Sequence, residues 1–484
     1  MEKFVSFAIV LLFAIIFLTS CSGEENLEEN NNVLRILAPR PPEIVPVIGV
    51  PWGSLNIYAE MFLEKHPYVE FIIEYYAEDW QFGSLGESRP TMSQLMALTT
   101  RLLADPPDLF IFDPNALVME KVNVSALFAD LNGFIDGPGG LDRDGYFDNI
   151  FRAMEQGSSL YTITPYILLD MILLNRYLFS LIGVDADEIS SISMGELLDY
   201  YRRIAAVYNN PLAPMTLHRS FTFPEILLHE ALYNIEDNAV NVNTPEMRER
   251  MDTALSMPDN LGSWSVNNLF MPDAWHFGRS QGSNPAGSRE AFFENTQHLI
   301  YRNIRNVREV RILYLQNHPE MLFTNPVHLI NDNGDIRFEA YEESFSIMRQ
   351  SRNQELAWDF IRFIMEIEDG SWWQGYPPHW HIPVNRARFY DRMEIEGNQG
   401  WDSAQRFDQI SLFLAEGESS ENQVTVAVDF FREAVESVNS QKVFNSPVYL
   451  SLIHPDLWLL HTGQQDIYRT LANIQNRLEL YVSE

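Results

Sequence analysis

The chain has 484 residues and a formal net charge of −34. That length exceeds the size at which a single hydrophobic core stops growing, so we expect more than one domain, and the charge disfavours nucleic acid as a partner because phosphates would be repelled. The single cysteine excludes an internal disulfide, thiolate zinc sites and iron–sulfur clusters.

The N-terminal stretch has the features of an export signal. After Lys3 comes the apolar run "FVSFAIVLLFAIIFL", which has the length of a secretory h-region and is short for a membrane span. The small residues Thr19 and Ser20 precede Cys21, and "LTSC" resembles the bacterial lipobox, whose cysteine is acylated and becomes the first mature residue. We expect a lipoprotein signal peptide over 1–20 and a lipid anchor on Cys21, with palmitate among its chains, at the extracytoplasmic face of the cell membrane. The alternative is an uncleaved anchor helix with an incidental cysteine.

The segment that follows predicts a tether and then a parallel sheet. Residues 21–32, "CSGEENLEENNN", are acidic and rich in amides, which is typical of a flexible tether. Apolar runs predict strands over 33–39, 69–76 and 108–113, and two stretches with helical spacing lie between them. This alternating order implies a parallel sheet with right-handed crossovers, and ligands of such sheets bind at the carboxyl ends of the strands.

Aromatic and acidic residues occupy the loops that leave these strands. They are Trp52, Tyr76, Trp80 and Asp113. Aromatic residues are ordinary in core strands and less so in polar loops after strands. We expect these four to line a pocket, and the alternative that they cover a surface seam stays open.

A second aromatic cluster lies in 371–385, "SWWQGYPPHWHIPVN". Glycine and proline break helices here, which favours a rigid loop that presents flat rings to the face of a sugar. The candidate ligand-binding residues of this loop are Trp372, Trp373, Tyr376 and Trp380, and Trp264 in a loop-rich stretch is a further candidate. Sealing of the loop against a neighbouring lobe is the open alternative.

Neither a metal site nor a catalytic site is expected. His379 and His381 have no third ligand at a readable spacing. The carboxylate-rich stretch 136–148 lacks the order of a calcium loop and is interpreted as an acidic surface loop. The sequence has no G-x-S-x-G, P-loop, G-x-G-x-x-G or H-E-x-x-H pattern, and we expect no cofactor and no enzymatic activity.

Several segments together resemble a known family. In chain order they are "TMSQLMALTTRLLADPPDLFIFD", "SSLYTITPY", "ILLDMILLNRYLFSLIGVD", "FSIMRQSRNQELAWDFIRFIMEIED" and "GQQDIYRTLANIQNRLELYVSE". They are similar to segments of the extracellular solute-binding proteins (family 1) of ABC importers. The resemblance implies a two-lobed, periplasmic-binding-protein-like α/β fold, in which each lobe is a mostly parallel sheet flanked by helices and a hinge of crossing segments joins the lobes.

The same resemblance implies a function. A monomer would capture a solute, a mono- or oligosaccharide, in the cleft between the lobes by hinge closure and deliver it to the permease of an ABC importer, with no bond made or broken. Tyr166, in the Tyr–Pro stretch, joins the expected ligand-binding residues.

The resemblance also predicts where the chain changes lobes. Crossings are expected within 161–171 and 338–348, with a return to the first lobe near 291–304. The expected N-terminal lobe is therefore 33–165 plus 292–342, and the expected C-terminal lobe is 166–291 plus 343–484.

Local patterns make three further predictions. "SMGELLDYYRRIAAVY" contains a capping box from Ser193 to Glu196. The second predicted helix places Leu95, Leu98, Leu102 and Leu103 inward. The last helix places an apolar stripe on one face, formed by Ile467, Leu471, Ile474, Leu478 and Tyr481.

Two other functions stay open at this point. A surface glycoside hydrolase needs two carboxylates roughly 5–10 Å apart, and a sequence with 67 Asp and Glu residues neither reveals nor refutes such a pair. A lipoprotein adhesin without a transport role would show neither sugar turnover nor binding of a small sugar.

Overall fold

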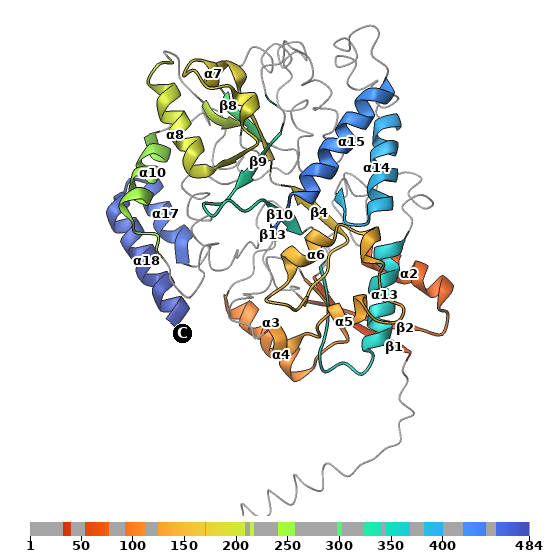
Figure 1. The fold of residues 1–484 in the computed structure, drawn as a ribbon. Coiled ribbons are helices and arrows are strands. Elements are labelled where there is room, and N and C mark those ends of the chain that lie inside the picture. Colours follow the sequence, from red (N-terminus) through yellow and green to blue (C-terminus); the bar gives the residue numbers. More distant parts are fainter. Residues whose placement is uncertain are drawn as a thin grey trace, which may run out of the picture.

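Figure 1 shows the fold in a computed structural model of the chain. The structure describes residues 32–39, 54–76, 92–112, 124–169, 171–208, 213–216, 241–256, 298–302, 324, 326–340, 344–367, 382–399, 420–441 and 452–483. Within these ranges the chain forms a mixed α/β fold with three sheets. None of the described helices combines the length and the apolarity needed to span a bilayer.

The first sheet contains the three strands expected near the N-terminus. Its order is β11-β3-β1-β2, where β1, β2 and β3 are parallel and β11 is antiparallel to β3. The strands are β1 (Val33–Pro39), β2 (Glu70–Tyr76), β3 (Leu109–Phe112) and β11 (Ser344–Ile347). The predicted parallel sheet is therefore present, and its antiparallel edge strand comes from more than 200 residues further along the chain.

Apolar clusters pack on both faces of this sheet, and successive side chains of a strand point to opposite faces. Leu34 and Ile36 of β1 lie in one apolar cluster, which we call the first core, and Leu37 lies in a smaller cluster on the other face. Helices α2 (Ser54–Lys65) and α13 (Gln354–Glu366) contribute Phe62 and Phe360 to the first core. Short helices on the same core are α5 (Asn132–Ile135) and α6 (Asp148–Met154), whereas α4 (Val124–Leu127) belongs to the smaller cluster.

Helix α3 (Met92–Ala104) covers the other face of the first sheet. Leu98 and Leu102 are buried there, as expected. Leu103 is 57% exposed, so its predicted inward position is wrong. One residue advances a helix by about 100°, and the burial of Leu102 therefore turns Leu103 away from the sheet.

A small second sheet lies between the two larger groups of elements (Figure 1). Its order is β12-β4-β10-β13, and its central pair is antiparallel, with Phe338 opposite Leu169 and Ala340 opposite Ile167. The strands are β4 (Tyr166–Leu169), β10 (Arg337–Ala340), β12 (Ile382–Pro383) and β13 (Ser440–Gln441), and helices α14 (Arg386–Gln399) and α15 (Ser420–Glu436) accompany them. We call β4 and β10 the crossing pair.

The third sheet has the order β6-β9-β5-β8-β7. Strands β6 and β9 are parallel, as are β7 and β8, and β5 runs antiparallel to both of its neighbours. The strands are β5 (Met171–Leu174), β6 (Ser191–Ser193), β7 (Ala213–Thr216), β8 (His298–Arg302) and β9 (Val327–Ile330). Like the first sheet, it combines parallel strands with one antiparallel strand.

Helices pack on this third sheet to form what we call the second core (Figure 1). They are α7 (Arg176–Ser180), α8 (Met194–Ala205), α10 (Pro245–Ser256), α17 (His454–His461) and α18 (Ile467–Ser483). Helix α8 begins with the predicted capping box: the Glu196 N–H donates to Ser193 Oγ over 3.2 Å, and the Ser193 N–H donates to Glu196 Oε2 over 2.8 Å. In α18 the predicted stripe is confirmed, since Leu471, Ile474 and Leu478 are fully buried.

Two segments lie in a different sheet or core from the one that the expected lobe boundaries implied. Strand β8 pairs with β5 and β7, so 298–302 lies in the third sheet although it was expected in the N-terminal lobe. Helix α13 packs in the first core although 343–484 was expected in the C-terminal lobe. Strand pairing is decided by long-range packing, and chain order alone does not express it.

We therefore propose different lobe boundaries. One lobe would contain 33–169 and 337–441, and the other would contain 171–330 and 452–483. The chain changes sheets at residue 170, inside the expected crossing 161–171. It changes back over 331–336, just before the expected crossing 338–348, and passes to the second core again after 441.

Candidate functional site

The strands of the first sheet all end or begin at one edge. Pro39 is opposite Tyr76, and the pairing of Leu37 with Phe110 places Phe112 at the same level. Ser344, the first residue of β11, is opposite Phe112. The chain thus leaves three parallel strands, and enters a fourth strand, at a single edge. The predicted site residues Trp52, Trp80 and Asp113 follow these strand ends in sequence and lie outside the described residues.

The third sheet has an equivalent edge. Ser193 at the end of β6 is opposite Ile330 at the end of β9, and Thr216 at the end of β7 is opposite Tyr301. Met171, where β5 begins, is at the same edge. Four parallel strands therefore end where the chain arrives from β4.

The crossing pair connects these two edges. Strand β4 leads through residue 170 into β5, and Ile330 at the end of β9 pairs with Ile336 just before β10. At its other end β10 stops at Ala340, four residues before Ser344, and four residues of extended chain span at most about 15 Å. Both carboxyl edges therefore lie beside the same pair of strands. These edges, with the crossing pair between them, are the candidate functional site.

Tyr76 is the first predicted site residue that the structure describes. It is 5% exposed, and its hydroxyl donates a hydrogen bond to the Ile111 carbonyl over 3.0 Å. Its ring stacks on Phe110 with a centroid distance of 5.4 Å. These contacts place Tyr76 in the packing of the first sheet, at the candidate edge, and a role in binding a ligand stays a prediction.

Tyr166 is the second, and it begins strand β4 of the crossing pair. It is 5% exposed, and the Arg388 guanidinium lies 5.2 Å from its ring centroid and donates to its hydroxyl. Arg388 also donates to the Ile364 carbonyl over 3.1 Å, at the C-terminal end of α13, where a cation interacts favourably with the helix dipole. Burial raises the pKa of the nearby Tyr146, whose hydroxyl donates to the Met365 carbonyl.

Arg388 was missed by the sequence reasoning. Its partner Tyr166 is more than 200 residues away in the chain, and no local pattern signals the contact. The arginine anchors the first residue of the crossing pair, so it fixes that end of the candidate site. The role of Tyr166 as a ligand-binding residue stays a prediction.

The remaining predicted site residues lie outside the described residues. They are Trp264, Trp372, Trp373, Tyr376 and Trp380, together with the predicted lipidation site Cys21 and the two histidines His379 and His381. Of the predicted ligand-binding residues, the structure therefore describes Tyr76 and Tyr166, together with the strands of the candidate site.

A tight turn joins the third sheet to the crossing pair. Asn331 Oδ1 accepts hydrogen bonds from the Asn333 N–H over 3.0 Å and the Asp335 N–H over 2.8 Å. Gly334 has φ +85°, a conformation that favours glycine. Arg250 of α10 donates to Asp332 over 3.0 Å. The sequence signalled this turn through "NDNGD", but only the fold shows that it is one of the passages between the sheets.

A direct contact also joins elements of the two cores beside the crossing pair. Ser437, just after α15, lies 3.3 Å from Nε2 of His328 in β9. On the side of the first core, Asn439 Oδ1 accepts from the Ile336 N–H over 2.9 Å, and Asn149 of α6 donates to the Val435 and Val438 carbonyls. A movement of one core against the other would change the contact of His328 most directly, because it joins elements of different cores.

The carboxylate-rich stretch 136–148 is held by an arginine. Arg143 donates through Nε to Asp136 over 2.6 Å and through Nη1 to Asp148 over 2.7 Å. The hydrogen bond to Asp136 is the main cause that raises the pKa of Arg143. Among the described residues, no three His, Cys, Asp or Glu side chains are grouped so that they could hold a metal ion.

Comparisons with known proteins give only structural matches. No family model and no curated protein matches the sequence. The structure is similar to the sugar-binding protein MalE from Xanthomonas citri, at 15% identity and a TM-score of 0.48 over 93% of this chain and 97% of that one. It is also similar to an extracellular solute-binding protein family 1 structure from Alicyclobacillus acidocaldarius, at 12% identity and a TM-score of 0.48 over 93% and 98% of the two chains. A third match is a Streptococcus pneumoniae solute-binding protein in complex with the blood group A-trisaccharide, at 12% identity and a TM-score of 0.47 over 93% and 100%.

Proposed function

We propose that this protein captures a small solute between two lobes and releases it to a transporter. The observation that carries the proposal is the arrangement of the crossing pair, which joins the carboxyl edges of two sheets that end their parallel strands there. Ligands of such sheets bind at that edge. A solute that contacts both edges favours the closed arrangement by the contacts that only the closed arrangement provides.

The proposed solute is a mono- or oligosaccharide. The support is the aromatic composition of the segments around 76–80 and 371–385, since flat rings with polar tips suit the faces of sugars. The resemblance of the sequence segments to family 1 solute-binding proteins supports delivery to an ABC permease. We propose that the protein performs this capture without chemical turnover.

A sugar screen by thermal unfolding tests the proposed capture. A ligand at one hundred times its dissociation constant stabilises the folded protein by about 2.7 kcal/mol, which raises the unfolding midpoint of a large lobe by about 5 °C or more. The effect should rise with sugar concentration, and the sugar should be recovered unchanged after incubation. If no mono- or oligosaccharide moves the midpoint, the proposed solute class is wrong. Release of reducing sugar from an oligosaccharide would instead establish a hydrolase.

Closure is tested separately by small-angle X-ray scattering. Addition of a sugar that raises the midpoint should reduce the radius of gyration, because the two lobes approach each other. A stabilising sugar that leaves the scattering curve unchanged would contradict the hinge mechanism while leaving sugar binding intact.

We also propose that Cys21 carries the lipid that holds the protein at the membrane, on the evidence of the sequence motif alone. Metabolic labelling with palmitate should mark the wild-type chain, and Cys21→Ser should abolish both the label and partition into a detergent phase. Labelling of the serine variant would refute the proposed anchor.

A further inference from the structure

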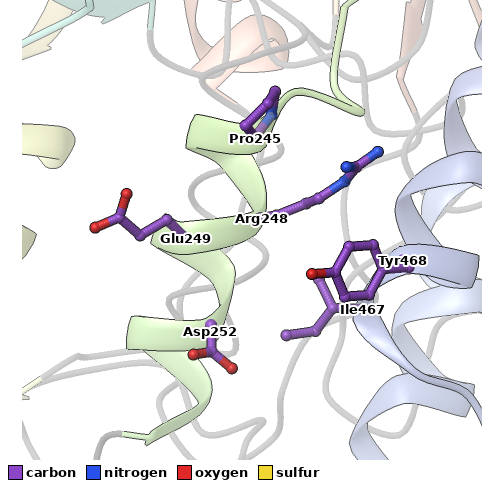
Figure 2. Close-up of a pocket in the computed structure, with 6 residues that line it drawn as sticks. All are labelled: Pro245, Arg248, Glu249, Asp252, Ile467 and Tyr468. Atoms are coloured by element: carbon purple, nitrogen blue, oxygen red, sulfur yellow. The ribbon is translucent and has the colours of Figure 1, made fainter.

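A pocket opens between two helices of the second core (Figure 2). Its volume is about 330 Å³, at the lower end of the range for small-molecule sites. Its lining comes from α10 and α18: Pro245, Arg248, Glu249, Asp252, Ile467 and Tyr468. None of these residues belongs to a strand or to the crossing pair, so the pocket is separate from the candidate site described above.

Hydrogen bonds hold the Arg248 guanidinium of this pocket in place without a ligand. Gln475 of α18 accepts hydrogen bonds from the Val242 N–H over 2.8 Å and the Asn243 N–H over 3.3 Å, which ties the start of α10 to α18. Asn243 Oδ1 in turn accepts from Arg248 Nε over 3.0 Å and from Nη2 over 2.6 Å. The Arg248 guanidinium lies 5.0 Å from the ring centroid of Tyr468, and Figure 2 shows the Arg248 side chain extending from α10 toward α18.

The aromatic group is presented to solvent on a rigid support. Tyr468 is 67% exposed although it lies in the first turn of α18. Beneath the two helices, Met247, Met251 and Leu471 are buried in the second core. An exposed ring on such a base provides apolar contact area with a hydroxyl at its tip.

The charges of the pocket favour a neutral ligand. The Glu249 carboxylate accepts from Arg202 of α8, and in Figure 2 it points away from α18. Of the two carboxylates that line the pocket, Glu249 is paired with Arg202, which leaves Arg248 and Asp252 as the charged groups that face a ligand. An anion would be repelled by Asp252 and a cation by Arg248. A ligand with hydroxyl groups, which both donate and accept, can use both side chains.

We propose that the pocket between α10 and α18 is a second binding site for a neutral polyhydroxylated ligand, a stretch of a glycan chain. Tyr468 provides the stacking surface, Arg248 donates to ligand oxygens, and Asp252 accepts from ligand hydroxyls. The proposal does not depend on the proposed function, because it concerns different elements of the fold.

Native gel electrophoresis through dissolved polysaccharide tests the proposal. The purified protein runs in gels that contain soluble starch, barley β-glucan or galactomannan, with polygalacturonate as an anionic comparison. At least one neutral polysaccharide should retard the protein, and Tyr468→Ala should weaken that binding about five- to tenfold. Tyr68→Ala is the matched control, because Tyr68 is 62% exposed and lies near the first sheet, and it should bind as the wild type does.

A second variant keeps the test decisive if Tyr468→Ala lowers stability. Asp252→Ser alters only an exposed side chain, and it should also weaken retardation without changing the unfolding midpoint. Equal retardation of wild type, Tyr468→Ala and Asp252→Ser would overturn the proposal, as would retardation by polygalacturonate alone or by none of the neutral polysaccharides. A midpoint shift by a small sugar that persists in Tyr468→Ala and Asp252→Ser belongs to the site between the sheets, so the two proposals fail independently.

Discussion

Replacement of Asp456 tests how the C-terminal helices are held on the second core. Its carboxylate is 1% exposed in the first turn of α17. Oδ1 accepts from Gln465 over 3.1 Å and from Asn473 over 2.9 Å, and Arg477 lies 2.8 Å from Oδ2. Asp456→Ala leaves these groups without their common acceptor. The residue therefore joins α17, the following turn and α18 in one polar network.

The expected loss of unfolding free energy in Asp456→Ala is the sum over the two neutral donors and the ion pair. Hydrogen bonds to a charged acceptor contribute about 1.5–3 kcal/mol each, and Arg477 is 41% exposed, so it regains water and adds little. We expect Asp456→Ala to lower the free energy of unfolding by about 3–6 kcal/mol. For a unit of this size the unfolding midpoint should fall by about 6–24 °C.

Differential scanning calorimetry and urea unfolding followed by circular dichroism measure the effect. Asp199→Ala is the control: Asp199 is an exposed aspartate of α8 paired with Arg202, and its loss should cost less than about 1 kcal/mol. If Asp456→Ala shifts the transition no more than Asp199→Ala does, the buried network does not hold the helices and the reasoning is wrong.

Three further predictions concern local structure. Ser193→Ala removes the capping box of α8 and should lower the free energy of unfolding by about 1 kcal/mol in urea titrations, whereas Ser193→Thr should retain most of it. Gly334→Ala introduces a side chain at φ +85° in the turn before β10 and should cost about 1–2 kcal/mol by the same measurement, and no loss would mean that the turn adopts another conformation. The hydrogen bond from Arg35 lowers the pKa of Asp105, so the stabilisation is present above the unfolded pKa and is lost as pH falls through the folded value. Carboxyl NMR titration should show that pKa rising in Arg35→Gln, and an unchanged pKa would contradict the assignment.

Local patterns in the sequence were sufficient for elements whose stability is local. The capping box of α8 joins residues three positions apart, and the stripe of α18 follows from helical geometry alone. The three N-terminal strands were also expected, because apolar runs between helical patterns favour a parallel sheet. The placement of Leu103 failed because two adjacent leucines cannot both face the sheet, and spacing alone did not decide between them.

The contacts within the candidate site could not be predicted from local patterns. The sequence indicated that strands would end in loops with aromatic and acidic residues. It did not indicate that Tyr76 donates to Ile111, or that Arg388 anchors Tyr166. Each of these contacts depends on which strands and helices become neighbours, and no periodicity in the chain encodes that choice.

The sequence by itself determined the alternation of strands and helices, the start of α8 and the buried face of α18, because each depends on residues within a few positions of one another. Only the tertiary structure decided that β8 joins the third sheet, that α13 packs in the first core and that β4 pairs with β10. These choices are made by pairing and burial between segments tens to hundreds of residues apart, where the free energy depends on the whole packed arrangement.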